Sequence, residues 1–423
     1  MEKDKNILII SMNPLDNNLN NGKTLVSFFK KYRKKNLAQL YFSEMLPNSN
    51  VCDNYFKISD KDMLWYRFNR APICGSRVMD NNDYIKEKVK QSEVANIKKT
   101  DLIRLFREFV WDDSWKSQRL FEWLDDFNPQ IIFFVAGDVV YSHKICLYIR
   151  RKYNTKLAVF VTDDYILPRN TISLFWWVRR NYVLKYMRRT VKIADLFITI
   201  SEDMRQTYYN LFQKDSFVAA NLSESMKIDG NITPKRNYIE IVYTGGLHLG
   251  RDKSLKRLAI ALQNINSKYN ITTKLKIYSA QKLSEKQKKY LTIDNVSSFE
   301  GLVEGDALKK VLNNADFLVH VESFKKKYRD STRLSLSTKI PEYLSVGKPI
   351  IAIGPQEIAS MRYLRDVAIY INTPKELEII LSPILLGKED SLNKYGKLAE
   401  QKYNKNHFEQ SKVSELMRLL KML

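Results

Sequence analysis

The chain has 423 residues, of which 44% are hydrophobic and 12% aromatic, and its 70 Lys and Arg residues outnumber its 47 Asp and Glu residues to give a formal net charge of +23. This length and composition predict a folded protein of about two or three domains and exclude an intrinsically disordered chain. The excess of positive charge predicts an anionic partner, which can be nucleic acid, an anionic membrane or a phosphorylated substrate.

The cysteines and the apolar runs bear on where the protein works. Cys52, Cys74 and Cys146 are unevenly spaced, which excludes a disulfide framework and a cysteine-based zinc site and is typical of a reducing cytoplasm. The first apolar run, at 7–11, is too short for a signal peptide. Since no apolar stretch approaches the roughly 18 residues of a membrane span, we expect a cytoplasmic protein.

Short apolar runs that alternate with helical stretches predict a parallel sheet in the first half of the chain. Buried strands are expected at 7–11, 37–43, 131–136, 157–161 and 196–200, with helices after 22 and at 143–153. Residues 44–128 predict helices with irregular connections and show no chemistry. The loop that contains Gly22 lacks the first glycine of a P-loop, so we interpret Gly22 as permitting a tight turn that brings backbone close to a ligand.

A stretch at 174–189 combines aromatic and aliphatic side chains at helical spacing with Arg and Lys between them. This pattern is typical of a helix that lies at a membrane surface, where Trp sits at headgroup depth and cations meet anionic lipid. An ordinary domain helix with a solvated basic face is the alternative. The residues predicted to contact the membrane are Trp176, Trp177, Arg179, Arg180, Arg188 and Arg189.

A polar linker at 213–237 precedes a second series of strands and helices, with strands expected at 239–243, 275–278, 296–299, 317–321, 349–353 and 368–371. Two successive series predict an α/β protein with two Rossmann-like, doubly wound domains that face a cleft. We assign 1–225 to an acceptor-binding domain, 236–400 to a nucleotide-sugar-binding domain and 401–423 to a C-terminal helix that crosses back to the first domain.

Two strand-to-helix connections in the second series predict anion binding. The loop at 244–253 holds three glycines, which let backbone approach a phosphate, and adds the charges of Arg251 and Lys253. At 335–354, a hydroxyl-rich loop with Ser337 and Thr338 opens a short helix that carries Lys339 and, one turn on, Glu342. Free N–H groups and a cation suit a phosphate, while a carboxylate suits a diol. Together they describe a nucleotide sugar.

Residues 239–357 resemble the nucleotide-binding domain of GT-B glycosyltransferases, closest to family 4 and to bacterial capsule or cell-surface polysaccharide enzymes. The resemblance is carried by 243–253, by Val296, Phe299, Gly301 and Val303, by 315–319, and by the motif Lys339-Ile340-Pro341-Glu342-Tyr343-Leu344-Ser345-Val346-Gly347-Lys348-Pro349. The first domain is similar more coarsely, through Gly22, Gly137-Asp138 and Thr162-Asp163-Asp164.

The resemblance implies roles for these residues. Arg251 and Lys253 would contact the donor diphosphate and assist its departure, and Glu342 would bind the ribose. The other residues implied in donor binding are Gly22, Gly245, Gly246, Phe299, Leu302, Val303, Ser337, Thr338 and Lys339. In the first domain, Asp163 or Asp164 would orient or deprotonate the acceptor hydroxyl; helix capping is the alternative interpretation of both.

One position departs from the family pattern. The family usually has a second acid eight positions before Glu342, and this chain has Leu334 there. The missing acid usually handles the transferred sugar, and Glu322, at the end of a strand, could replace it. His143 is interpreted as a satisfied helix residue, and His248 as a loop residue near the phosphates.

The sequence therefore predicts a hexosyltransferase that moves a sugar from a nucleotide-sugar donor to a membrane-associated, polyprenyl-linked saccharide in capsule or cell-surface glycan synthesis, with retention of configuration. It would be peripheral on the inner face of the membrane. No metal-ligand spacing occurs, and we expect no metal and no cofactor beyond the donor. The alternatives are a UDP-sugar epimerase of GT-B fold and a basic nucleic-acid-binding protein; nucleic acid is the less favoured partner because the cations gather at one helix and two helix starts.

Overall fold

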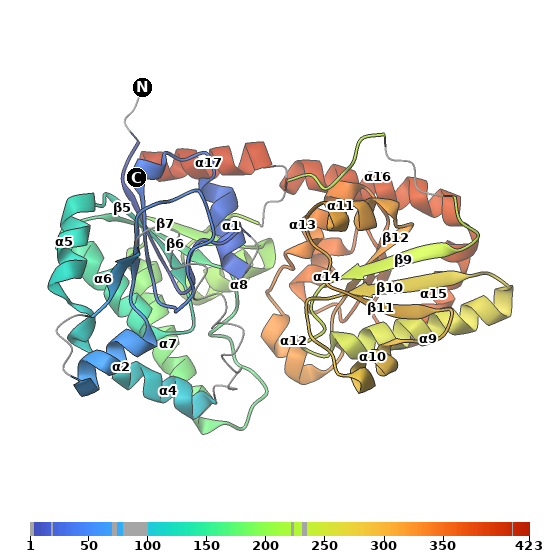
Figure 1. Ribbon diagram of the computed structural model, residues 1–423, viewed down its shortest axis with the longest axis horizontal. Helices are drawn as coiled ribbons and strands as arrows, with labels where there is room; N and C mark the ends of the chain where they lie inside the picture. Colours follow the sequence, from blue (N-terminus) through green and yellow to red (C-terminus); the bar gives the residue numbers. More distant parts are fainter. Residues whose placement is uncertain are drawn as a thin grey trace. The chain divides into compact units, whose positions relative to one another are not determined.

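The computed structural model describes residues 4–17, 20–69, 74–78, 100–220, 224–230, 235–407 and 409–423. The chain divides into two compact units, one formed by Met1–Ala219 with Val413–Leu423 and the other by Ala220–Lys412 (Figure 1). The predicted linker at 213–237 falls partly on 221–223 and 231–234, which lie outside the described residues.

Among its described residues, the first unit has an eight-stranded sheet in the order β4-β3-β2-β1-β5-β6-β7-β8. All neighbours are parallel except β3 and β4. The strands are β1 (Ile7–Ser11), β2 (Leu37–Tyr41), β3 (Tyr55–Lys57), β4 (Ser76–Val78), β5 (Ile131–Ala136), β6 (Lys156–Val161), β7 (Leu196–Thr199) and β8 (Phe217–Val218). The apolar runs thus predicted the long central strands, whereas the short strands β3, β4 and β8 gave no run to recognise.

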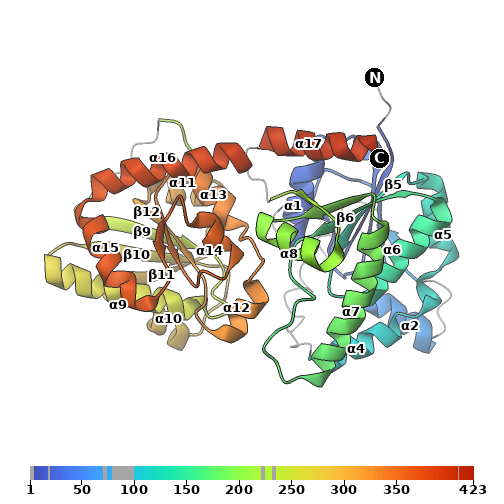
Figure 2. The same ribbon diagram turned by 180° about the vertical axis from the view of Figure 1, so that it is seen from behind.

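Helices cover both faces of this sheet (Figures 1 and 2). Adjacent strand residues point to opposite faces: Phe133 packs on Phe29 of the first helix with ring centroids 5.2 Å apart, and Phe134 packs on the His143 ring at 4.9 Å. The helices are α1 (Asn20–Phe29), α2 (Asp60–Asn69), α4 (Asp101–Val110), α5 (Gln118–Phe127), α6 (Val140–Tyr153), α7 (Leu174–Ile193) and α8 (Glu202–Phe212), with short 3₁₀ turns at Lys34–Asn36 and Asp113–Trp115.

The last helix, α17 (Glu409–Met422), returns to this first unit as predicted, because residues from Val413 onward belong to it. The Lys421 ammonium lies 2.8 Å from a carboxylate oxygen of Asp4. Leu416 and Leu420 of the same helix are fully buried.

The second unit has, in its described part, a six-stranded parallel sheet in the order β11-β10-β9-β12-β13-β14. Its strands are β9 (Ile239–Thr244), β10 (Thr273–Tyr278), β11 (Ser297–Gly301), β12 (Phe317–Val321), β13 (Ile350–Ile353) and β14 (Ile369–Ile371). Its helices are α9 (Arg251–Tyr269), α10 (Glu285–Leu291), α11 (Gly305–Asn314), α12 (Lys326–Thr332), α13 (Lys339–Val346), α14 (Ala359–Leu364), α15 (Leu377–Leu386) and α16 (Lys388–Asn406), with a 3₁₀ turn at Pro374–Glu376.

Two apolar clusters cover the two faces of the second sheet. Ile241 and Tyr243 of β9 pack with α9, α10 and α15, whereas Val242 packs with α11, α13, α14 and α16. This alternation buries the strands on both faces, which is what a doubly wound sheet requires. The unit is therefore a three-layer α/β structure, in agreement with the predicted fold class.

Candidate functional site

The ends of the parallel strands bring the predicted donor residues to one edge of the second sheet. Backbone bonds link the connections there: the Gly245 amide donates to the Tyr278 carbonyl at 3.0 Å, and the Glu322 amide donates to the Ile353 carbonyl at 2.8 Å. This carboxyl edge is where open α/β sheets bind their ligands.

The glycine-rich connection between β9 and α9 packs tightly. The Tyr243 hydroxyl donates to the Gly246 carbonyl at 2.7 Å. Gly250 has a φ of +78°, and a Cβ built there would lie 2.6 Å from the Ser323 hydroxyl oxygen. Only glycine therefore fits at 250, and its place there lets the start of α9 approach the end of β12.

Arg251, the first residue of α9, forms a buried ion pair with Glu322, the residue after β12. One guanidinium nitrogen lies 3.1 and 3.2 Å from the two carboxylate oxygens, and the side chains are 18% and 3% exposed. His320 lies 3.4 Å from the same carboxylate. Burial alone would raise the pKa of Glu322, but Arg251 and His320 lower it below its ordinary value, so the carboxylate is charged at neutral pH.

Further cations gather beside this ion pair. The positive charge of Lys253 lowers the pKa of the exposed Lys325. His248 also lies here, and burial together with Arg251 lowers its pKa. The N-cap residues of α9 and α13, Gly250 and Thr338, make no side-chain cap, although the Ser337 hydroxyl accepts from the Lys339 amide at 3.4 Å. The helix dipoles at both starts add to the positive field.

The start of α13 places the remaining predicted donor residues. The Lys339 ammonium lies 3.2 Å from a carboxylate oxygen of Glu342, which is 3% exposed. The Ser337 amide donates to the Ser360 hydroxyl at 3.1 Å, and Thr338 is exposed. The Glu342 carboxylate is therefore buried and paired with the Lys339 ammonium. Its contact with a ribose stays a prediction.

The side chains of residues 299–303, at the end of β11 and just after it, differ in exposure. Phe299 packs against the core and Val303 packs against the opposite cluster, whereas Leu302 is 59% exposed. Gly301 has a φ of +82° and its carbonyl accepts from the Ser279 amide at 2.7 Å. Leu302 is therefore the exposed apolar side chain of this segment, and the contact of the segment with a base stays a prediction.

Leu334, which stands where the family pattern has an acid, is 4% exposed. An apolar side chain that is buried cannot be exchanged for a carboxylate without a large desolvation cost. Glu322, the suggested replacement, is paired with Arg251. This geometry favours Glu322 as a positioning residue for Arg251 over the direct sugar contact that we predicted.

In the first unit, Asp164 serves the turn after β6. It is 1% exposed, and its carboxylate accepts from the amides of Ile166 at 3.1 Å and Leu167 at 2.9 Å. These bonds form an Asx turn, and the next helix begins only at Leu174, so the interpretation of Asp164 as a helix cap is wrong. Its predicted role as a catalytic base stays a prediction. Asp163 is half-buried, with the Tyr165 hydroxyl 3.4 Å away, and also remains a candidate.

Gly22 lies inside α1 rather than in a loop turn. A Cβ at this position would lie 2.8 Å from both the Asp16 amide nitrogen and the Pro14 carbonyl oxygen. The chain's own backbone therefore requires a glycine here, and the predicted loop turn at Gly22 is corrected to a helix. The approach of a ligand to Gly22 stays a prediction.

Sequence reasoning missed a charged cluster at the end of β5. One oxygen of Asp138 lies 3.0 Å from guanidinium nitrogens of both Arg104 and Arg179. Arg179 also donates to the Asp138 carbonyl at 3.0 Å. The signal available in sequence was an acid that follows a buried strand, but its partners come from two helices far apart in the chain.

This cluster corrects part of the predicted membrane contact. Arg179 and Trp176 are each 6% exposed, so both face the interior and cannot meet lipid. Trp177 and Arg180 are half-buried, and Arg180 donates to the Ile166 carbonyl at 2.6 Å. Arg188 and Arg189 are exposed, and their contact with a membrane stays a prediction.

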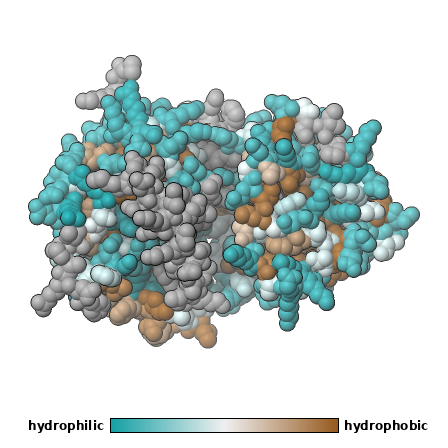
Figure 3. Space-filling model, in the orientation of Figure 1, coloured by the Kyte–Doolittle hydropathy of each residue, from teal (hydrophilic) through white to brown (hydrophobic). Residues whose placement is uncertain are grey.

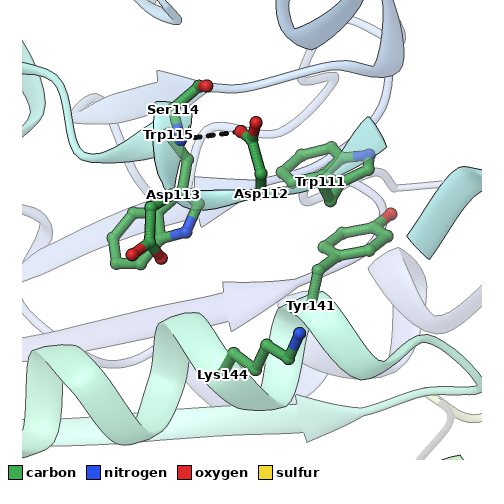
Figure 4. Close-up of a pocket in the computed structure, with 7 residues that line it drawn as sticks. All are labelled: Trp111, Asp112, Asp113, Ser114, Trp115, Tyr141 and Lys144. Atoms are coloured by element: carbon green, nitrogen blue, oxygen red, sulfur yellow. Dashed lines mark hydrogen bonds between the residues drawn. The ribbon is translucent and has the colours of Figure 1, made fainter. Parts of the chain in front are cut away.

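A cavity of about 600 Å³ lies near α6 in the first unit (Figure 4). It is lined by Trp111, Asp112, Asp113, Ser114, Trp115, Tyr141 and Lys144. The indole of Trp111 stacks on Tyr141 at 3.8 Å, and the Asp112 carboxylate accepts from the Ser114 amide at 2.9 Å. Because the rings are buried against one another and the Asp112 carboxylate bonds within a turn, these contacts stabilise the local structure.

Nowhere in the described residues do three or more His, Cys, Asp or Glu side chains group as metal ligands.

No protein-family model and no curated protein sequence matches the chain. Solved structures match over nearly its whole length. A glycosyltransferase from Rickettsia africae ESF-5 is 12% identical, with 98% of each chain covered and a TM-score of 0.60. An E. coli trehalose-6-phosphate structure bound with UDP-2-fluoro glucose is 12% identical, with 99% of each chain covered and a TM-score of 0.58. A mutant of S. aureus TarM, in complex with Fondaparinux, alpha-GlcNAc-glycerol and UDP, is 10% identical, with coverage of 98% and 99% and a TM-score of 0.59. The predicted GT-B fold is thereby confirmed.

Proposed function

We propose that the protein is a glycosyltransferase that takes a sugar from a nucleotide-sugar donor bound at the carboxyl edge of the second sheet. The observation that carries the proposal is the buried Arg251–Glu322 pair at the start of α9, with the exposed cations Lys253 and Lys325 close to its two members in the chain. Several cations at one edge of a sheet favour the binding of an anion, and a diphosphate carries a matching negative charge. The UDP and the UDP-sugar present in two of the similar structures support a donor of this class.

The residues of this edge suit the departure of a diphosphate. Negative charge grows on the leaving group as the glycosidic bond breaks, and cations fixed in advance stabilise it without reorganising. Glu322 holds one nitrogen of Arg251, so the rest of the guanidinium is oriented before the donor arrives. Lys253 and the starts of α9 and α13 complete the positive field, and Glu342 binds the ribose.

The acceptor we propose is a membrane-associated, polyprenyl-linked saccharide of a capsule or cell-surface glycan, with transfer of a hexose and retention of configuration. Asp163, at the end of β6, orients the acceptor hydroxyl. The net charge of +23 and the basic helix α7, which carries no acidic residue, support a site at an anionic membrane on its cytoplasmic face.

A thermal-shift screen against nucleoside diphosphates and their sugars tests the donor site first. A ligand at about 100 times its dissociation constant should stabilise the protein by roughly 2.7 kcal/mol. Lys253→Gln should weaken the best ligand about tenfold, as expected for the loss of one charge-assisted contact, while Lys286→Gln on the exposed face of α10 should not. A screen without any stabilising nucleotide would refute the proposal.

Product analysis then separates the reaction classes. Transfer should yield a new glycoside whose anomeric configuration, read by nuclear magnetic resonance, matches that of the donor. An epimerised sugar formed without acceptor would favour the epimerase instead. Salt-sensitive binding of duplex nucleic acid without nucleotide-sugar affinity would favour the nucleic-acid alternative.

A further inference from the structure

Large apolar side chains cover the outer surface of α4 and the start of α7. Phe109 is 71% exposed, Leu174 is 71% exposed and Ile172 is fully exposed. We call this surface the α4–α7 patch; it comprises Leu102, Ile103, Phe106, Phe109, Ile172, Leu174, Phe175 and Val178. Figure 3 shows hydrophobic atoms gathered at the lower edge of this unit, below α4. A patch of this many large residues marks an interaction surface rather than ordinary surface scatter.

Two contacts show that the patch is continuous. The Ser173 hydroxyl, which caps α7, lies 3.1 Å from a carboxylate oxygen of Asp101 at the start of α4. Farther along, Arg104 of α4 and Arg179 of α7 share one oxygen of Asp138. The two helices therefore lie side by side with their first turns adjacent, and their outward apolar residues form one surface.

Beyond the patch, the outward face of α7 changes from apolar to basic. Residues three, four or seven apart share a helix face, and the stripe that starts at Leu174 and Val178 continues through Lys185, Arg188 and Lys192, all exposed. No acidic residue occurs anywhere in α7. At 1.5 Å per residue, the cations begin about 10 Å from the last apolar residue.

We propose that the α4–α7 patch docks on an anionic lipid leaflet, with its apolar side chains between the headgroups and the basic end of α7 against the phosphates. Apolar residues next to a cationic face are the pattern of interfacial binding. A second copy of this chain would instead bring two basic stripes together, which repel. No helix in the described parts of the chain could cross a bilayer. Docking on lipid does not depend on the donor chemistry. Only its purpose rests on the proposed function, since docking would bring the enzyme to an acceptor in the membrane.

Vesicle flotation of the full chain tests the docking, with vesicles of phosphatidylcholine alone or mixed equally with phosphatidylglycerol. The wild type should float with the anionic vesicles. Phe106→Ser with Phe109→Ser should lower partitioning by at least about tenfold, and so should Lys185→Gln with Arg188→Gln. The matched controls are Ile379→Ser with Leu386→Ser, which are exposed on α15, and Lys286→Gln with Lys289→Gln; these should float like wild type.

A labelled cysteine shows which surface meets the lipid. All three native cysteines are buried, so a polarity-sensitive fluorophore can be placed on Phe106→Cys, with Ile379→Cys as its control. Anionic vesicles should shift the emission to the blue at 106 only. The proposal fails if the wild type does not float, if the Phe variants float equally well, or if the shift at 106 follows protein concentration without vesicles, which would indicate self-association.

A failure of the docking proposal can be distinguished from a failure of the proposed glycosyltransferase function. Flotation needs no nucleotide, and nucleotide-sugar binding needs no vesicle. The Phe106→Ser, Phe109→Ser variant should keep its nucleotide affinity and its thermal midpoint, because both side chains are exposed and lie outside the donor unit. A variant that had lost its fold would lose both.

Discussion

The ion pair of Arg251 with Glu322 predicts that donor binding and folding can be separated by a double substitution. Arg251→Gln removes the cation and leaves Glu322, 3% exposed, without its guanidinium partner. Arg251→Gln combined with Glu322→Gln removes both charges. We expect the single variant to lose stability and nucleotide affinity, and the double variant to recover much of the stability but none of the affinity.

The distances set the magnitude. One nitrogen lies 3.1 and 3.2 Å from the two oxygens, and at an effective dielectric constant of about 20 this attraction is worth roughly 5 kcal/mol. Loss of one partner of a buried pair costs about 3–5 kcal/mol. For a unit of this size, each kcal/mol moves the thermal midpoint by about 2–4 °C, so the single variant should melt roughly 6–20 °C lower.

Thermal unfolding and calorimetric titration with a nucleoside diphosphate measure the two effects. A cycle of both single variants and the double variant should give a coupling of about 2 kcal/mol in stability. The surface pair of Arg329 with Glu357, 3.2 Å apart and 32% and 59% exposed, is the matched control and should give less than about 1 kcal/mol. If the double variant regains nucleotide affinity, Arg251 acts only as the partner of Glu322 and the reasoning is refuted.

The same pair predicts a pH dependence. Since the pKa of Glu322 lies below its ordinary value of 4.5 in the folded state, its contribution to stability is complete above about pH 4.5 and is lost as the pH falls through the folded pKa. The double variant lacks this group, so its stability should fall less steeply in acid.

Three further predictions concern single residues. Gly250→Ala should lower stability by about 1–3 kcal/mol more than Gly305→Ala, because both have positive φ but a Cβ meets the Ser323 hydroxyl only at 250; equal losses in thermal melts would exclude the clash. His143 is fully buried and its pKa is lowered to about 4, so the first unit should lose roughly 3 kcal/mol of stability as the pH falls from 6.5 to 4, and His143→Leu should flatten that limb of the pH titration. Glu108→Ala should cost about 1–3 kcal/mol by leaving the Val140 and Tyr141 amides unbonded, with exposed Glu122→Ala as a neutral control in denaturant unfolding.

The elements that the sequence predicted well are those whose pattern is local. Buried parallel strands appear as continuous apolar runs, so β1, β5 and β12 were found at their observed bounds. The short strands β3, β4 and β8 have two or three residues each, and they form only because a neighbouring strand pairs with them. Their position follows from tertiary pairing, which no local window contains.

The candidate site divides in the same way. The glycine-rich connection and the start of α13 are strand-to-helix turns whose residue types indicate an anion site, so Arg251, Lys253 and Lys339 were found. The partnership of Arg251 with Glu322 spans 71 residues and could not be predicted from spacing. It changes the meaning of Glu322, from a substitute for the acid missing at Leu334 to the residue that orients a cation.

Glu108 shows the same limit for a helix start. The residue before α6 is Val139, which offers no side-chain cap, and a sequence window would therefore place no strong helix boundary there. The cap comes instead from Glu108 on α4, whose carboxylate accepts from the Val140 amide at 2.7 Å and the Tyr141 amide at 3.1 Å. Because α4 is fixed in this way by the buried end of α6, its other face is left outward with its apolar residues.

Helix α7 shows why composition can single out a candidate membrane-surface helix but cannot tell which of its faces lies outward. When aromatic and basic residues occur on all sides of a helix, its sequence does not show which side is buried. By residue type alone, Trp176 and Arg179 suit a lipid contact as well as Phe175 and Arg188 do. The choice is made by Asp138 at the end of β5, which binds Arg179 and turns that side of α7 inward. Because Arg179 is buried, the apolar residues on the opposite side of α7 lie outward and form part of the α4–α7 patch. Vesicle flotation can measure whether this patch contacts anionic lipid.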